Sequence, residues 1–406
     1  MKIISVIDWF KIGNGATSAI TTINSFFKDG GIDYSVLFDY SKGVLPENTH
    51  KWSDDLFLQI VDNRKDVIVH YYLSGGKKGR GIFFKLVNCC KFHGLTIPIV
   101  TTVLQRPSYA YCMLSPYIIH HSSHIVFIDK ASYNDSLYSF IPAERKSMFY
   151  CNFPFPAHEI AKLDQLAKVR DNHNKNERFV YGRGSVINKC PQDTIEVFEQ
   201  IDVGPKYFVI CGVDDDSWIA KKARYKKNIK TYPNKSFEEW KLICSTFDVF
   251  LYYLPKDTYS SLDGNLGLAM RLGIPPIVYG PDAPKERIVQ GVNGFVAETK
   301  DEILRYAKLL FEDDELRKTI GKNARDMTYS MFHGRQTLDG YVSLYKRLLA
   351  GDIGGGFIIP RRLFWTCFIK NRIFIARMYF EKIKRGVSLI VTPRNMIRKF
   401  YLNFLK

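Results

Sequence analysis

Short, continuously apolar segments alternate with longer helix-like segments along most of this chain. Apolar runs without polar alternation are typical of parallel strands that are covered on both faces. The β-α-β-α order therefore predicts doubly wound α/β architecture rather than a helical bundle or an all-β fold. The expected strands are 2–7, 34–38, 67–71, 97–103, 125–128, 179–181, 207–211, 249–253, 276–278 and 294–296, and the expected helices include 16–28, 194–200, 237–244, 301–312 and 336–349.

The alternation is interrupted once, around residues 152–177. Asn152–Pro156 contains two prolines, residues 171–177 are polar and rich in asparagine, and a new apolar segment begins at Phe179. We therefore expect two α/β domains with a ligand cleft between their sheets, beside the carboxyl ends of the strands. The predicted boundaries are 1–153 for the N-terminal domain, 154–177 for a linker, 178–350 for the C-terminal domain and 351–406 for a tail.

The chain is basic, with 58 Lys and Arg against 41 Asp and Glu, a net charge of +17. Residues 355–406 hold twelve of the basic residues and one acid, so this segment carries +11 and the remainder carries +6. Such an excess predicts an anionic partner, which could be a membrane face, a phosphate-bearing substrate or nucleic acid. Nucleic acid is the least favoured of the three, because no known nucleic-acid-binding module is recognisable.

Ten residues of the same basic segment are Phe, Trp or Tyr. Amphipathic basic helices rich in aromatic residues lie in bilayer interfaces, with their cations at anionic headgroups. We expect residues 357–406 to dock on an anionic membrane surface. The alternative is a helix that packs back on the N-terminal domain while its cations stay in water.

The eight cysteines include no C-x-x-C pair, and no apolar run is long enough to span a bilayer. The first residues also lack the apolar core of a secretory signal. We therefore expect reduced thiols and a cytoplasmic protein, peripheral on the inner membrane face.

Three segments could contact a ligand. Gly13, Asn14 and Gly15 follow the first strand and precede a helix, which suits either an anion-binding loop or a plain turn. Arg183 and Lys189 flank a loop after the first strand of the second half, so both could reach one diphosphate, or both could be solvated surface cations. A glycine-rich loop then leads through Gly264–Gly267 into a short helix that ends near Gly273.

Taken in order, these segments resemble the donor-binding half of family-four retaining glycosyltransferases with the GT-B fold. The resemblance is strong over 178–349 and weaker over 1–150. It rests on Gly182-Arg183…Lys189, on Gly267-Leu268-Ala269-Met270 with Gly273-Ile274-Pro275, on Gly291–Val296, on the acid-rich segment 312–317 and on the Tyr-x-x-Leu-Tyr spacing of 341–345.

The resemblance implies specific roles. The two domains would face each other across a cleft, with the acceptor on the N-terminal side and a nucleotide-sugar donor on the C-terminal side. Arg183 and Lys189 would bind the donor diphosphate, with the loop Gly13, Asn14 and Gly15 nearby. Backbone amides of Gly264, Asn265, Leu266 and Gly267 would face the donor. The implied activity is retaining hexosyl transfer to a lipid-linked or polysaccharide acceptor, as in cell-surface glycan or capsule synthesis, with no metal or other cofactor.

The sequence departs from the family pattern at the two donor-site glutamates, which are replaced by Ser260 and Leu268. Asp263 is a weak candidate to replace the first, and nothing replaces the second. A histidine common after the fourth strand is Leu104 here. The sequence therefore identifies no catalytic residue. It leaves open an alternative, in which a catalytically inactive GT-B protein binds a glycan, a partner or a membrane.

Overall fold

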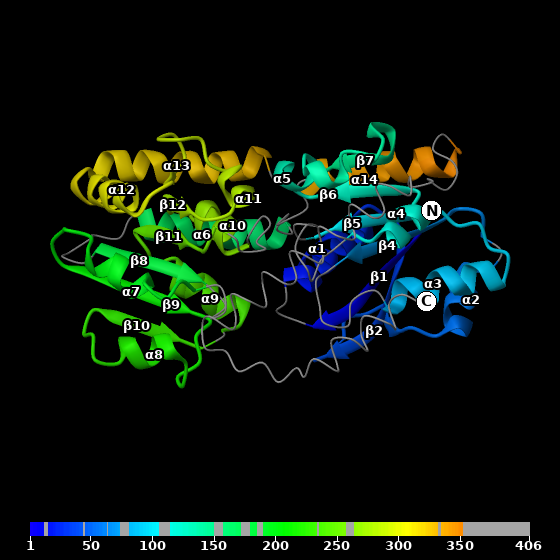
Figure 1. Ribbon diagram of the computed structural model, residues 1–406, viewed down its shortest axis with the longest axis horizontal. Helices are drawn as coiled ribbons and strands as arrows, with labels where there is room; N and C mark the ends of the chain where they lie inside the picture. Colours follow the sequence, from blue (N-terminus) through cyan, green and yellow to red (C-terminus); the bar gives the residue numbers. More distant parts are fainter. Residues whose placement is uncertain are drawn as a thin grey trace.

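A computed structural model of the chain describes residues 1–11, 15–43, 45–62, 64–73, 81–104, 114–149, 157–171, 179–184, 190–233, 235–256, 264–331 and 334–351. These residues form two parallel β-sheets, each covered by helices, which make up the two halves of the molecule in Figure 1.

The first sheet has the strand order β3-β2-β1-β4-β5-β6-β7, and its neighbouring strands pair in parallel. Its strands are β1 (Lys2–Lys11), β2 (Asp33–Lys42), β3 (Thr49–Lys51), β4 (Val67–Leu73), β5 (Ile99–Val103), β6 (His124–Phe127) and β7 (Lys146–Met148). The helices between them are α1 (Gly15–Asp29), α2 (Asp54–Val61), α3 (Gly81–Phe92), α4 (Pro116–His121) and α5 (Lys130–Tyr133), with single 3-10 turns at Ser136–Tyr138 and Ala143–Arg145.

The second sheet repeats this arrangement in the order β10-β9-β8-β11-β12-β13, again with parallel pairs. Its strands are β8 (Phe179–Gly184), β9 (Lys206–Cys211), β10 (Ile229–Tyr232), β11 (Val249–Tyr253), β12 (Pro276–Tyr279) and β13 (Phe295–Val296). The remaining helices are α6 (Ala157–Asp171), α7 (Thr194–Glu199), α8 (Trp218–Ala223), α9 (Phe237–Cys244), α10 (Gly264–Arg271), α11 (Asp282–Lys285), α12 (Lys300–Glu312), α13 (Asp314–Met331) and α14 (Gly334–Leu349).

The central strands show why their sequences are continuously apolar. Along β4, Val67, Val69 and Tyr71 enter one hydrophobic cluster, whereas Ile68 and Tyr72 enter the cluster on the opposite face of the sheet. Strand β11 divides its side chains between two clusters in the same alternating way. Successive side chains point to opposite faces of the sheet, and both faces are buried. Residues on either face must therefore be apolar, so the strand has no polar alternation. The two doubly wound domains expected from the sequence are confirmed as the fold.

Helix α14 lies on the first sheet, although the sequence placed residues up to 350 in the C-terminal domain. Tyr341, Leu344 and Tyr345 are buried in the same cluster as Ile3 and Ile20 of the first half. Figure 1 shows α14, in orange, among the blue and cyan elements. Gly340 permits this approach, since a Cβ there would lie 2.9 Å from the ring of Phe149. The chain thus crosses from the second half back to the first before it ends.

The segment predicted as a linker, 154–177, contains helix α6. This helix packs on the second half, where Leu163 is fully buried beside α10 and Asp164 accepts a hydrogen bond from Arg271 at 2.5 Å. The exact domain boundaries remain a prediction. The short strands β3, β7 and β10 were not predicted, because their residues are partly exposed and form no apolar run.

Five cysteines fall within the described residues, and all five are free thiols. Among the same residues, no helix combines the length and the apolar character that crossing a bilayer requires. The predicted membrane-docking segment 357–406 lies outside the described part of the chain.

Candidate functional site

In each sheet the strand order reverses direction at one point, between β1 and β4 in the first and between β8 and β11 in the second. Helices that leave the two central strands there run to opposite sides, so the carboxyl ends of these strands border a crevice that commonly binds ligands in doubly wound folds. Two of the three segments singled out from the sequence lie at the end of the first strand of their half. Segment 13–15 follows β1, which ends at Lys11, and segment 183–189 begins within the last two residues of β8. The third, 264–267, follows β11.

On the first sheet, α1 begins at Gly15, shortly after β1 ends at Lys11. The first turn of a helix has backbone N–H groups without partners inside the helix, which favours an anion at this end. A buried hydrogen bond from Ser5 Oγ to Asn24 Oδ1, 3.1 Å long, helps to fix α1 against β1. Gly13 and Asn14 lie outside the described residues, so their predicted contact with donor phosphates stays a prediction.

On the second sheet, Arg183 is the penultimate residue of β8 and pairs in register with Ile210 of β9. Its backbone therefore lies at the carboxyl edge, inside the strand rather than in the loop after it, because β8 extends to Gly184 and does not end at residue 181 as expected. The partner cation Lys189 is outside the described residues, and the convergence of the two side chains on a diphosphate remains a prediction.

Helix α10 begins at Gly264, so Gly264, Asn265, Leu266 and Gly267 form its first turn. The helix ends at Arg271, and the turn after it contains Gly273, whose φ of +73° suits glycine. The backbone N–H groups of Gly273 and Ile274 donate to the carbonyl oxygens of Met270 and Ala269 at 3.0 Å each. These contacts fix the carboxyl end of the helix. Asp263 and Ser260 lie in that loop, outside the described residues.

The positions that depart from the family pattern are apolar and buried. Leu268 is 1% exposed and belongs to the hydrophobic cluster around α10, together with Phe250 and Met270. Leu104 is 5% exposed and packs in the core of the first half. Neither position provides a carboxylate or an imidazole to a ligand.

Polar side chains that the sequence did not indicate connect the end of β11 to the starts of α7 and α12. The hydroxyl of Tyr253, the last residue of β11, donates to Asp193 Oδ1 and Oδ2 at 2.9 and 3.1 Å, and Lys300 forms an ion pair with the same carboxylate. Burial alone would raise the pKa of Asp193, but the hydrogen bonds from Lys300 and Tyr253 outweigh it and lower the pKa. Nearby, Lys256 lies 5.4 Å from the ring centroid of Tyr279, directly before the loop 257–263.

A comparable anchor lies in the first half. Asp8, a buried residue in β1, accepts a hydrogen bond from the Tyr71 hydroxyl at 2.5 Å and another from the backbone N–H of Ile82 at 3.2 Å. The carboxylate therefore holds the first turn of α3 against the sheet. A single Asp within an apolar strand makes no recognisable pattern, so the sequence analysis did not find it.

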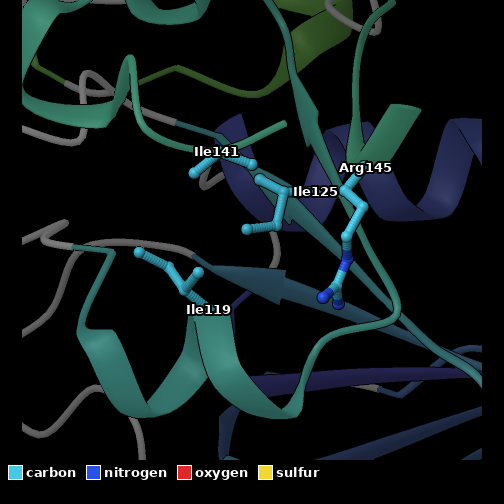
Figure 2. Close-up of a pocket in the computed structure, with 4 residues that line it drawn as sticks. All are labelled: Ile119, Ile125, Ile141 and Arg145. Atoms are coloured by element: carbon cyan, nitrogen blue, oxygen red, sulfur yellow. The ribbon is translucent and has the colours of Figure 1, made fainter. Parts of the chain in front are cut away.

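Figure 2 shows a small pocket in the first half, lined by Ile119, Ile125, Ile141 and Arg145. Ile125 is near the start of β6 and Arg145 directly precedes β7, so the pocket lies at the amino edge of the sheet, opposite the crevice. It has no room for a ligand. No group of three or more His, Cys, Asp and Glu side chains within the described ranges is arranged to hold a metal ion.

Comparison with known families gives the decisive observation. Residues 164–327 match the family model described as "Glycosyl transferases group 1". This part of the chain is a group 1 glycosyl transferase domain. The match contains α10, Arg183 and all six strands of the second sheet, so the resemblance to GT-B glycosyltransferases is confirmed where the sequence motifs are strongest.

Solved structures with a similar fold extend the likeness to the N-terminal half. Alr3699/HepE of Anabaena, in complex with UDP and glucose, has a TM-score of 0.64 at 14% identity, over 85% of this chain and 99% of that one. A glycosyltransferase from Rickettsia africae has a TM-score of 0.64 at 12% identity, over 86% and 98%. WaaG, a glycosyltransferase involved in lipopolysaccharide biosynthesis, has a TM-score of 0.56 at 12% identity, over 83% and 98%.

These likenesses establish the GT-B fold for the group 1 glycosyl transferase domain and the half that precedes it. A search of curated protein sequences found no significant match. The family match confirms the enzyme class expected from the sequence. The retaining outcome, the acceptor, the membrane contact and the independence from metals remain predictions.

Proposed function

We propose that this protein transfers a sugar from a nucleotide-sugar donor to an acceptor hydroxyl. The observation that carries the proposal is the match of residues 164–327 to the glycosyl transferase family, with Arg183 at the carboxyl end of β8 inside the matched segment. The similar fold of HepE, which is in complex with UDP and glucose, supports the choice of a nucleotide sugar as donor.

In this proposal the acceptor oxygen bonds to the anomeric carbon of the donor sugar while the bond from that carbon to the diphosphate breaks. The acceptor loses its hydroxyl proton, and a nucleoside diphosphate leaves. Arg183 and Lys189 would balance the charge that develops on the leaving diphosphate, and first-turn amides of α1 and α10 would add hydrogen bonds. The residues themselves then supply the positive charge, and the proposal includes no metal.

For the acceptor we propose a lipid-linked or polysaccharide glycan at the inner membrane face. The basic, aromatic segment 357–406 supports this choice, because it follows α14 closely and α14 packs on the half that would bind the acceptor. A segment that held this half at anionic headgroups would bring the cleft close to lipid-linked substrates. The fold shared with WaaG is compatible with such an acceptor.

A second candidate is a GT-B protein that binds a glycan, a partner or a membrane without catalysis. The burial of Leu268 and Leu104 favours it, because neither family position can supply a polar group. Both candidates have the same fold, but only the first predicts that the protein turns over a nucleotide sugar.

The test is a thermal-shift screen of the full-length protein against UDP-, GDP- and dTDP-sugars, followed by an assay of nucleoside diphosphate release. A ligand at one hundred times its Kd stabilises a folded protein by about 2.7 kcal/mol, which a melting curve resolves readily. Stabilisation with release supports the enzyme, and stabilisation without release supports the binding protein. If no nucleotide sugar raises the melting temperature, the proposed donor site is wrong.

A further inference from the structure

Two short helices from opposite halves meet at the centre of the molecule. Helix α5 directly follows β6 of the first sheet, and α11 directly follows β12 of the second, so both start from carboxyl strand ends. Figure 1 shows the two helices side by side between the halves, and they are in contact. Gly280 turns the chain from β12 toward α11 at a φ of +139°, where a Cβ would lie 3.0 Å from the carbonyl oxygen of Leu254.

Glu286, at the end of α11, makes the contact. Its Oε2 accepts a hydrogen bond from the backbone N–H of Lys130 at 2.8 Å, and its Oε1 accepts one from the backbone N–H of Ala131 at 2.6 Å. These two N–H groups belong to the first turn of α5, where the helix offers them no internal acceptor. Each carboxylate oxygen of Glu286 therefore satisfies one backbone donor of the other half.

The surroundings make this contact depend on close approach. Burial raises the pKa of Glu286, and the neighbouring Asp129 carboxylate raises it further, whereas the two backbone N–H groups act in the opposite direction. Asp129 is itself fixed as the N-cap of α5, since its Oδ1 accepts from the Ser132 N–H at 2.6 Å. A half-buried carboxylate beside another carboxylate is favourable only while both hydrogen bonds are made.

Glu286 is also held firmly on its own side. The next residue, Arg287, is buried, and its carbonyl oxygen accepts a hydrogen bond from Asn293 Nδ2 at 2.9 Å. Asn293 Oδ1 in turn accepts from the backbone N–H of Val289 at 2.7 Å. Because the segment after α11 is braced in this way, a loss of the Glu286 contact would act on the spacing of the two halves rather than on a loose loop.

We infer that Glu286 is a positioning residue that holds the two halves at the spacing where donor and acceptor meet. The role of Glu286 in catalysis rests on the proposed glycosyl transfer, but its contact with α5 of the other half does not. Neither Glu286 nor the α5 donors stood out in the sequence, because a carboxylate-to-backbone contact between residues 156 positions apart follows no local pattern.

Two variants test the contact, one at the acceptor Glu286 and one at a backbone donor of α5. Glu286→Gln keeps one acceptor oxygen and places an amide NH₂ against the second backbone N–H. Lys130→Pro removes one N–H from the first position of α5, where proline is well tolerated, and Asp129 already has the extended backbone (φ −150°, ψ 158°) that a residue before proline prefers. The matched control is Glu302→Gln, because Glu302 accepts from the backbone N–H of Glu298 at 2.7 Å entirely within the second half.

Small-angle X-ray scattering of the full-length protein without ligand is the deciding measurement. We expect a larger radius of gyration for Glu286→Gln and for Lys130→Pro, no further increase in the double variant, and an unchanged value for Glu302→Gln. A purely structural role would lower the melting temperature of Glu286→Gln and leave the radius of gyration of the folded protein unchanged. An unchanged radius in both single variants overturns the inference.

Titration with UDP provides the second measurement. If closure brings both halves to the nucleotide, Glu286→Gln should weaken UDP binding by about tenfold, the equivalent of one charge-assisted hydrogen bond. If the wild-type protein does not bind UDP at all, the result counts against a UDP-sugar donor, and the scattering comparison still decides the role of Glu286. The two ideas can therefore fail separately.

Discussion

The hydroxyl oxygen of Tyr345 lies 2.6 Å from Nδ1 of His70, which joins the last described helix, α14, to strand β4 in the middle of an apolar core. The other ring nitrogen of His70 is 2.7 Å from Thr102 Oγ1, and this hydroxyl is 2.9 Å from the hydroxyl of Tyr341. A neutral imidazole has one donor and one acceptor nitrogen, so both are satisfied. The chain of polar contacts fixes α14 on the first half.

Removal of one hydroxyl should measure the strength of this attachment. Tyr345→Phe leaves a fully buried ring nitrogen of His70 without its partner, and we expect a loss of about 1–3 kcal/mol in the free energy of unfolding. Urea unfolding followed by circular dichroism measures it. Tyr306→Phe is the control, since the Tyr306 hydroxyl accepts from Gln290 Nε2 at an exposed site. If both variants lost the same free energy of unfolding, the buried contact would stabilise the fold no more than the exposed one.

Acid should destabilise the fold through the same histidine. Burial lowers the pKa of His70 to about 3, so the unfolded chain binds a proton below about pH 6.5 that the folded chain excludes. Stability is therefore complete above the unfolded pKa and falls as the pH drops from 6.5 toward 3, by up to about 1.4 kcal/mol per pH unit. Burial, together with the nearby charges of Arg347 and Arg145, lowers the pKa of His124 to about 4, so His124 adds to this loss of stability.

Melting temperatures measured between pH 7 and pH 4 test this expectation. His70→Gln should start from a lower melting temperature at pH 7 and lose less of it on acidification. His93→Gln, at an exposed position, should follow the wild-type curve. If wild type and His70→Gln have parallel curves, His70 does not titrate as proposed.

Arg183→Ala should weaken nucleotide-sugar binding by about tenfold or more, because a charge-assisted contact to a diphosphate contributes on the order of 1.5–3 kcal/mol. Isothermal titration with the best nucleotide sugar from the thermal-shift screen measures the change. Lys221→Ala, an exposed cation of α8, serves as control. An unchanged affinity in a folded Arg183→Ala protein would identify Arg183 as an ordinary surface cation.

Restoring the family residue at position 268 should damage the fold. Leu268→Glu buries a carboxylate among apolar side chains of the α10 cluster, and we expect a loss of about 3 kcal/mol or more in unfolding free energy. Leu309→Glu, on the exposed side of α12, should change stability little. If Leu268→Glu proved as stable as wild type and gained activity, position 268 would face the donor and not the core.

Deletion of the basic segment should abolish membrane binding. Each Lys or Arg near an anionic surface contributes about 1 kcal/mol, so twelve such residues would hold the protein reversibly on vesicles. Sedimentation with phosphatidylserine-containing vesicles compares the full chain with a 1–354 truncation, and neutral vesicles serve as control. Equal binding by both proteins would refute the membrane role of residues 357–406.

The sequence by itself determined the α/β class, the two repeated halves and the family of the second half. These conclusions rest on local patterns. A strand buried on both faces needs a continuous apolar run, as in Val67–Leu73, and the turn after α10 needs glycine at position 273 for its positive φ. The sequence also placed Arg183 close to a strand end, although β8 extends to Gly184, beyond the expected end at residue 181.

Only the tertiary structure decided which faces meet. Helix α14 has an apolar face that could cover either sheet, and the fit of Tyr345 to His70 and of Gly340 to Phe149 places it on the first. The bridge from Glu286 to α5 and the burial of Leu268 likewise join residues far apart in the chain. Hydrophobic periodicity shows that a face will be buried, but the partner depends on packing between distant segments, which no local pattern records.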